Sequence, residues 1–237
     1  ESLWDIRDYT YAGWQLYYSE YTDGLLKGCD IRAEDGQLVI GKGMLKFHDF
    51  IYLMMEEERV DYQPKNRWQV LKAEFSEDET NLDYKAYRVR FFLDEEMELG
   101  ENQIEMCRFY LREGSVLRDS YKNFADMSTE YDTINLIYAT VAGVGEKTLH
   151  PALLLQFVEE LWNMKEKDAA DVGICSLIWN AQGRVERKVI VAYLCGKLAD
   201  HTAEKNDNNR IYGDMERIIG NKNSRMERKT PKRIVVE

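Results

Sequence analysis

The stretch from Asp23 to Glu58 constrains the fold most, because turn-forming residues cut it into apolar runs that are too short for helices. The runs are Leu38–Ile40, Met44–Phe47 and Phe50–Met55, and the separators are Asp35-Gly36, Gly41-Lys42-Gly43 and His48-Asp49. Short runs rich in Ile, Val, Phe and Tyr favour strands, and glycine supplies the positive φ that tight turns need. We therefore predict a compact β-meander, with a hairpin turn at His48-Asp49.

Strand character continues to about Arg112. Trp68 to Phe75 has strand character, and Ile104 to Arg112 is predicted to be one more strand. Between them, Tyr87, Val89, Phe91 and Leu93 alternate with Arg88, Arg90 and Phe92, which is the period of a half-buried strand. We predict that residues 1–112 form an antiparallel β domain of about six strands, preceded by an aromatic N-terminal segment.

The periodicity becomes helical from Thr148. Thr148 can cap a helix, Pro151 suits its first turn, and apolar residues then recur at three- and four-residue spacings. Further helical runs follow at Ala170–Trp179, Val185–Leu198 and Asn209–Ile219, and Gly220-Asn221 is a natural terminator for the last one.

The expected fold class is therefore α+β, with an N-terminal antiparallel β domain followed by a small C-terminal helical bundle. We expect the bundle to span residues 148–220. Residues 113–147 mix turn formers with apolar residues and are predicted to be a linker with local structure. Residues 221–237 are polar and basic and are predicted to be a C-terminal arm.

Charge is unevenly distributed along the chain. The net charge is −11, but the part from Arg217 onward carries seven Lys and Arg against two acidic residues. That part has a net charge of +5, which leaves −16 for the rest. Because nucleic-acid affinity comes mainly from Lys and Arg at phosphates, we do not expect the body to bind nucleic acid. The basic arm alone predicts only weak, salt-sensitive contacts.

The sequence also bears on compartment. It has no apolar run near the ~20 residues that a membrane-spanning helix needs, and no charged-then-apolar leader at its start, so we expect a soluble protein. The cysteines are widely spaced among apolar neighbours and form no CxxC pair: Cys29, Cys107, Cys175 and Cys195. This pattern predicts free, buried thiols and folding in a reducing cytoplasm.

One segment approaches a phosphate-binding loop. Residues 139–148 end in Gly143-Val-Gly145-Glu146-Lys147-Thr148 before the first predicted helix of the bundle. In a true loop of this kind glycine directly precedes lysine, whereas here Glu146 intervenes and the first glycine is missing. A turn at the start of a helix is the simpler interpretation. A cryptic nucleotide-binding or hydrolytic enzyme that uses this loop and nearby acids stays open as an alternative.

No other pattern predicts catalysis. The histidines His48, His150 and His201 lack the spacing of a metal site, and there is no Gly-x-Ser-x-Gly elbow. We therefore predict no catalytic residue, no metal and no cofactor, although a Cys–His pair could still meet in space.

The N-terminal segment is unusually aromatic: Trp4, Tyr9, Tyr11, Trp14, Tyr17, Tyr18 and Tyr21. Such a segment either packs onto the meander or meets a partner, because aromatic side chains combine large apolar areas with polar tips. The candidate partner-contact residues are Trp4, Trp14, Tyr17 and Tyr18, with Ile234, Val235 and Val236 as an apolar patch in the arm that could add to a neighbour as an edge strand. A carbohydrate- or surface-binding module that uses Trp4, Trp14 and Trp68 is a further alternative.

A family resemblance completes the prediction. The residues that carry it are Gly24-Leu-Leu-Lys-Gly28-Cys-Asp-Ile31, Gly36-Gln-Leu-Val-Ile40, Gly43-Met-Leu-Lys-Phe47 and Phe50-Ile-Tyr-Leu53. They resemble a recurring N-terminal module of tail- and baseplate-associated proteins from bacteriophages and prophages. Residues 109–114 and 135–137 are similar to prophage proteins of Firmicutes type.

The resemblance implies a non-enzymatic structural or assembly component of a phage-like tail or baseplate. Such a component acts through protein–protein contacts, as a homo-oligomer and with other phage-tail-like structural proteins. It would be made in the bacterial cytoplasm and then enter a virion or tail-like particle. The resemblance brings no catalytic residue with it.

Overall fold

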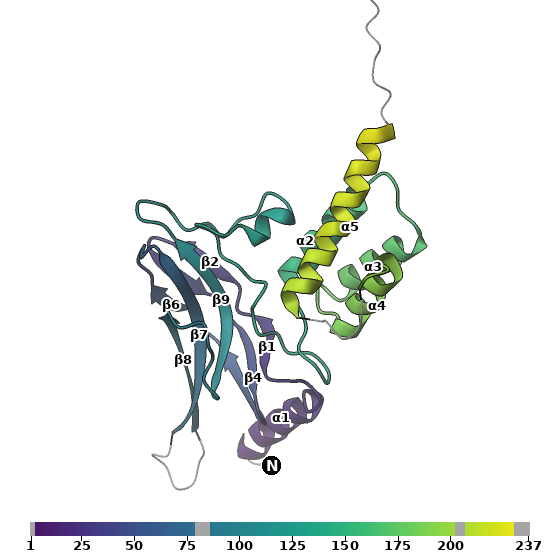
Figure 1. The fold of residues 1–237 in the computed structure, drawn as a ribbon. Helices are drawn as coiled ribbons and strands as arrows, with labels where there is room; N and C mark the ends of the chain where they lie inside the picture. The colour runs from purple at the N-terminus through teal and green to yellow at the C-terminus, as the bar shows by residue number, and fades with distance from the viewer. Residues whose placement is uncertain (1–2, 79–85, 202–206, 230–237) are drawn as a thin grey trace, which may run out of the picture.

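The computed structural model describes residues 3–78, 86–201 and 207–229. They form an N-terminal helix, nine strands, a short 3₁₀ helix and four further α-helices, which confirms the predicted α+β organisation (Figure 1). The elements of the β part are α1 (Leu3–Tyr17), β1 (Gly24–Gly28), β2 (Ile31–Glu34), β3 (Gln37–Ile40), β4 (Gly43–Phe47), β5 (Phe50–Met54), β6 (Glu58–Asp61), β7 (Arg67–Asp78), β8 (Ala86–Asp94) and β9 (Gln103–Leu111). The remaining elements are η1 (Ala125–Ser128), α2 (Pro151–Asn163), α3 (Ala169–Asn180), α4 (Arg187–Lys197) and α5 (Asn208–Lys229).

The strands form three antiparallel three-stranded sheets, in the orders β1-β4-β5, β2-β3-β6 and β8-β7-β9. In the described part of the chain, the number of strands is nine rather than about six, and the predicted meander is corrected as well: β1 pairs with β4 rather than with β2, so the strands of residues 23–58 divide between two sheets. We keep the name meander for residues 23–58. The hairpin turns predicted at Asp35-Gly36 and His48-Asp49 are confirmed. Asp35 and Gly36 both have positive φ between the paired residues Glu34 and Gln37, which is the geometry of a two-residue hairpin. His48 has a φ of 52° in the tight β4–β5 turn.

The chain passes between two of these sheets at a close backbone crossing. It leaves β1 at Gly28 and returns to β4 at Gly43, while Cys29 N donates to Lys42 O at 3.0 Å. A Cβ on Gly43 would lie 2.4 Å from the Cys29 nitrogen, and one on Gly28 would lie 2.2 Å from Lys42 O. Gly28 also has a φ of +66°. Only glycine fits this crossing, which is why the meander is punctuated there.

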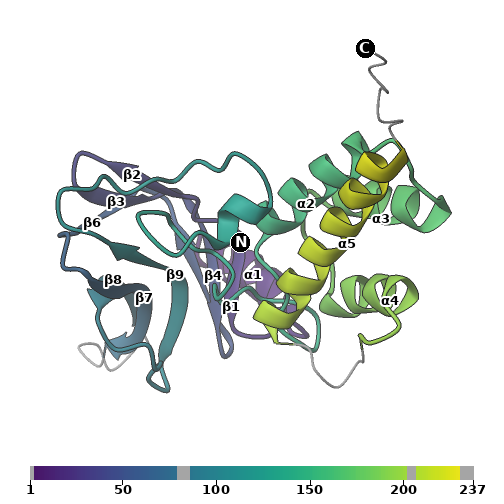
Figure 2. The ribbon, with the colours of Figure 1, turned by 45° about the horizontal axis from the view of Figure 1, so that its top comes forward.

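The segment predicted to be a linker is an integral part of the core. Its residue Thr140 donates its amide to Glu105 O of β9 at 2.7 Å and accepts from Leu25 N of β1 at 2.9 Å, so the segment runs between two sheets. Buried side chains from residues 117–141 belong to the same hydrophobic cluster as the strands and the helices. One continuous core therefore extends from the sheets into the helices. Figure 2 shows the strands and the group of helices α2–α5 as neighbouring parts of the fold. The predicted domain boundaries remain predictions.

The helical part follows the predicted order, with different ends. His150 rather than Thr148 is the N-cap of α2: its side chain accepts from Ala152 N, and Pro151 opens the helix. The helix predicted to stop at Gly220-Asn221 instead continues to Lys229, so the prediction of its end was wrong. A glycine inside a helix costs only about 1 kcal/mol, and the residues that follow Gly220 are mostly compatible with a helix.

A buried charge cluster fixes α5 to the preceding loop. His201 and Asp214 are both almost fully buried, and His201 Nδ1 lies 2.7 Å from Asp214 Oδ2. Asp214 also forms ion pairs with Arg210 at 2.8 Å and Arg217 at 2.6 Å. Burial alone would raise the pKa of Asp214, but the His201 and Arg217 hydrogen bonds and the arginine charges outweigh it and hold that pKa below its usual range.

The glycine crossing predicts the effect of one added methyl group. Gly43→Ala should lower the free energy of unfolding by at least about 2 kcal/mol, because backbone atoms on the other side of the crossing must move. The matched control is Gly213→Ala in α5, where a Cβ meets nothing within 4 Å and helix propensity should add up to about 1 kcal/mol of stability. Urea denaturation measures both, and a Gly43→Ala protein as stable as its parent would contradict the crossing.

The Asp214 cluster predicts a stability that depends on pH. The pKa of Asp214 is lower in the folded state than in the unfolded chain. The stabilising contribution of the ionised carboxylate is therefore complete above the unfolded pKa of about 4, and it is lost as the pH falls through the folded pKa. Denaturation at a series of pH values should show a shallower acid-induced loss for Asp214→Asn than for the parent. Glu101→Gln, at an exposed position in the β8–β9 turn, should leave the slope unchanged. An unchanged slope in Asp214→Asn would refute this assignment.

Candidate functional site

The aromatic N-terminal segment is a helix that contacts the meander through one side. Trp14 and Tyr18 pack against a small buried cluster formed by Leu26, Ile51 and Ala142. At the β4–β5 hairpin, Gln15 Nε2 donates to Asp49 O at 2.9 Å. The Tyr11 ring lies 6.5 Å from that of Phe50, and its hydroxyl accepts from Ile51 N at 3.4 Å. The sequence assigned no element to this segment, because its aromatic residues are as common in strands as in helices.

The opposite side of α1 is exposed. The exposed fractions are 80% for Tyr9, 77% for Leu16 and 71% for Tyr17. These positions have the i, i+7, i+8 spacing that places residues on one face of a helix. Gly13, between them in the sequence, is exposed and carries no side chain. We name Tyr9, Gly13, Leu16 and Tyr17 the outer face of α1.

The structure separates the predicted contact residues. Tyr17 belongs to the outer face, whereas Trp14 and Tyr18 are half-buried against the meander. Trp4 lies within α1. Ile234, Val235 and Val236 lie outside the described residues. One side of the segment therefore packs on the meander, and contact with a partner stays a prediction for the exposed side of α1. Sequence reasoning missed Leu16, which the helical spacing would have placed beside Tyr17.

In the segment that approaches a phosphate-binding loop, the backbone amides of residues 143–145 already donate to acceptors within the protein. Gly143 N donates to Thr22 Oγ1 at 3.3 Å, Val144 N to Glu186 Oε2 at 2.8 Å, and Gly145 N to Glu20 O at 2.9 Å. A phosphate loop needs its amides free to surround the anion. In a phosphate-binding loop, the hydroxyl at the position of Thr148 binds the magnesium ion of the nucleotide. Here the Thr148 hydroxyl donates to Val185 O at 2.6 Å. The geometry therefore gives no support to the nucleotide-binding alternative.

The other chemically active side chains are dispersed. His48 is in a turn, His150 caps α2 and His201 is buried with Asp214. Burial and the charge of Arg184 lower the pKa of His150 to about 4, so its ring is neutral and Nδ1 can accept from Ala152 N. Among the described residues, no three His, Cys, Asp or Glu side chains are arranged to hold a metal ion.

The cysteines are free, as predicted, and three of them are buried. Burial raises the pKa of the Cys29 thiol to about 12 and raises that of Cys107 further, so both are inert as nucleophiles at neutral pH. Cys195 is exposed, which corrects the expectation that all four are buried. It lies on the outward side of α4, because Tyr193 and Leu194 take the inward positions.

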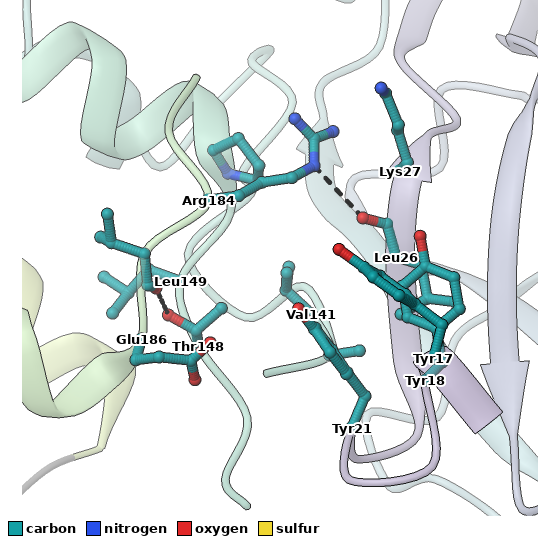
Figure 3. A pocket seen from close by; sticks show the side chains of 13 residues that line it. Tyr17, Tyr18, Tyr21, Leu26, Lys27, Val141, Thr148, Leu149, Arg184 and Glu186 are labelled. Carbon is teal, nitrogen blue, oxygen red and sulfur yellow. Dashed lines mark hydrogen bonds between the residues drawn. The ribbon is translucent and has the colours of Figure 1, made fainter. Parts of the chain in front are cut away.

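A pocket of about 210 Å³ lies where α1, the meander and the helical part meet. We call it the junction pocket. Its walls are Tyr17, Tyr18, Tyr21, Leu26, Lys27, Val141, Ala142, Thr148, Leu149, Pro151, Arg184, Val185 and Glu186. Figure 3 shows the side chains of Arg184 and Lys27 on one side of the pocket and Glu186 on the other. Sequence reasoning missed this pocket, since its residues come from segments far apart in the chain.

Hydrogen bonds fix two of the charged groups in the junction pocket. Arg184 Nε donates to Leu26 O at 3.2 Å and so connects the loop before α4 to β1. Glu186 accepts from Val144 N at 2.8 Å. Burial, with additional effects of neighbouring Tyr and Glu groups, raises the pKa of Tyr18 and of Tyr21, so both hydroxyls are protonated donors at neutral pH.

Comparisons with known proteins place the chain in no family. No protein-family model matches it, and no curated protein matches it. Among solved structures, the crystal structure of TssK matches with 11% sequence identity and a TM-score of 0.37. That match covers 91% of this chain and 64% of the TssK chain, so the chain spans less than two thirds of its length. The score is too low to establish a shared fold or to carry a function.

None of the helices in the described part of the chain is both long and apolar enough to cross a membrane.

Proposed function

We propose that the chain is a non-enzymatic assembly component of a phage-like tail or baseplate and that it self-associates through the outer face of α1. The observation that carries the proposal is the exposure of Tyr9, Leu16 and Tyr17 on a helix whose other side is packed on the meander. Large aromatic and aliphatic side chains on a rigid helix are typical of the centre of a protein interface.

The occupant of this face is a second copy of the chain. In the part of α1 where side-chain exposure is described, residues 9–17, no residue is charged. This uncharged stretch lowers the charge repulsion between two acidic proteins with a net charge of −11 each. Gly13 lets another backbone come close between the exposed side chains. A contact between the same face on two copies is isologous and closes a dimer, and the larger symmetric assembly of a tail or baseplate is built by adding other contacts to that dimer.

Two observations support the tail-like assignment. The first is the resemblance of the glycine-punctuated meander to the N-terminal module of tail and baseplate proteins. The second is that the resembling residues form a real structural unit, since they build the crossing between two sheets and the surface on which α1 packs. Partnership with other tail proteins and assembly in the bacterial cytoplasm before incorporation into a virion or tail-like particle are part of the same proposal.

Leu16→Glu tests the self-association. It places a charge in the outer face and should shift the protein from oligomer to monomer, with at least a tenfold rise in the dissociation constant, because burying an unpaired carboxylate at an interface is costly. Light scattering coupled to size exclusion measures the mass across a range of concentrations.

The matched control is Val116→Glu. Val116 is 83% exposed in a loop after β9, so the same charge is added to an equally exposed apolar position. This variant should keep the parent's mass. A parent that is monomeric at every concentration, or a Leu16→Glu protein that assembles like the parent, would refute the proposed function.

A further inference from the structure

The junction pocket has features of a ligand site, and apart from Tyr17, which also belongs to the outer face of α1, its residues take no part in the proposed assembly contact. It encloses about 210 Å³ and is bounded by five separate segments, which are residues 17–21 at the end of α1, residues 26–27 of β1, residues 141–142, residues 148–151 and residues 184–186 before α4. Small-molecule sites commonly lie at such junctions, where one ligand touches several elements at once. We propose that this pocket binds a small organic acid, with the carboxylate at Arg184 and Lys27 and an apolar or planar body against the tyrosines.

Unused hydrogen-bond donors support an anion. Within the described residues, no hydrogen bond or ion pair occupies the Lys27 ammonium or the hydroxyls of Tyr17, Tyr18 and Tyr21. Arg184 uses Nε and Nη1 on Leu26 O and Gln182 O, which leaves Nη2 without a partner in the same part of the chain. Two exposed cations and several tyrosine hydroxyls thus line one small pocket, and carboxylates are the common ligands of such a set.

The position that a bound carboxylate would take is also defined. Arg184 is anchored to the backbone of β1, so a carboxylate would not have to order a free side chain in order to bind. The acidic group of the wall, Glu186, is held by Val144 N on the other side of the pocket (Figure 3). An anion at Arg184 therefore avoids the site's own carboxylate.

The remaining walls define the body of the ligand. Leu26, Val141, Leu149 and Val185 are buried and give the pocket an apolar base. The rings of Tyr18 and Tyr21 meet edge to face at 5.2 Å and form an aromatic wall. The volume suits a single ring or a short aliphatic chain with one acid group and is too small for a nucleotide.

Benzoate and benzamide form a matched pair of probes, because they share size and shape and differ in charge. Isothermal titration of the full chain with each should give saturable binding of benzoate with one site and at least tenfold weaker binding of benzamide. Inorganic phosphate, which has charge without an apolar body, should also bind at least tenfold more weakly than benzoate. Equal affinities for benzoate and benzamide, or no binding of benzoate, would overturn the proposal.

Variants identify the site. Arg184→Gln should weaken benzoate at least tenfold and leave benzamide unchanged, and Lys27→Gln should weaken benzoate severalfold. Tyr18→Phe keeps the ring and removes the hydroxyl, so it tests the donor without disturbing the packing. Lys147→Gln is the matched control, since it removes an exposed cation from a nearby loop that does not line the pocket, and should stay within twofold of the parent.

The same chemistry could be delivered by an acidic side chain of a neighbouring subunit. Light scattering on Arg184→Gln separates the two sources, and Arg184 itself lies outside the outer face of α1. A parent-like oligomer with benzoate binding lost supports the small-acid site. If the parent binds no benzoate and Arg184→Gln loses the oligomer, the pocket is a contact between subunits. That result overturns the small-acid proposal and leaves the proposed self-association standing.

Discussion

The structure depends on one close contact between two backbone segments. Between Gly28 and Gly43 the chain leaves one sheet, forms the β2–β3 hairpin and returns, and the two glycines let the backbones of the passing segments come into contact. The hydrogen bonds from Cys29 N to Lys42 O and from Gly41 N to Asp30 O connect them. This contact fixes two sheets relative to each other and places β1 and β4 where α1 can pack. The surface proposed for assembly therefore depends on two glycines that it does not contain.

The segment between the strands and the helices connects these two parts of the fold. It pairs with β1 and β9, and its carbonyls accept from Asn208 Nδ2 at Ile137 and from Arg187 Nε at Lys147, both at 2.6 Å. The helices are consequently attached to the sheets through a shared core. This attachment creates the junction pocket, because Arg184 can reach Leu26 O only when the loop before α4 is held against β1.

Much of the fold follows from local signals in the sequence. The Asp35-Gly36 turn, the alternating strand β8 and the helix that begins near Pro151 all have short-range causes, such as positive φ, period-2 burial and a proline in the first turn. The features that were missed have long-range causes. Helix α1 is aromatic and is stabilised by Trp14 and Tyr18 against the meander rather than by its own propensity. Helix α5 passes Gly220 because one glycine does not end a helix that is anchored through Asp214.

The same distinction applies to the candidate site. Aromatic content predicted either packing onto the meander or contact with a partner, but only the structure divides that segment into a packed side and an exposed side. The glycine loop at residues 143–148 resembled a phosphate site in sequence, yet its amides are bonded to Thr22, Glu186 and Glu20. Those partners are distant in the chain, so no motif could have revealed them. The junction pocket was hidden for the same reason.

The central claim is that the outer face of α1 is covered by a second copy of the chain. Hydrogen–deuterium exchange of residues 9–17, followed by mass spectrometry over a dilution series, tests it most directly, since backbone amides exchange more slowly when a helix end is held in an interface. The account predicts that these residues become protected as concentration rises, while the central strand β7 exchanges equally at every concentration. Exchange in residues 9–17 that is independent of concentration, in samples shown to contain the oligomer, would contradict the account.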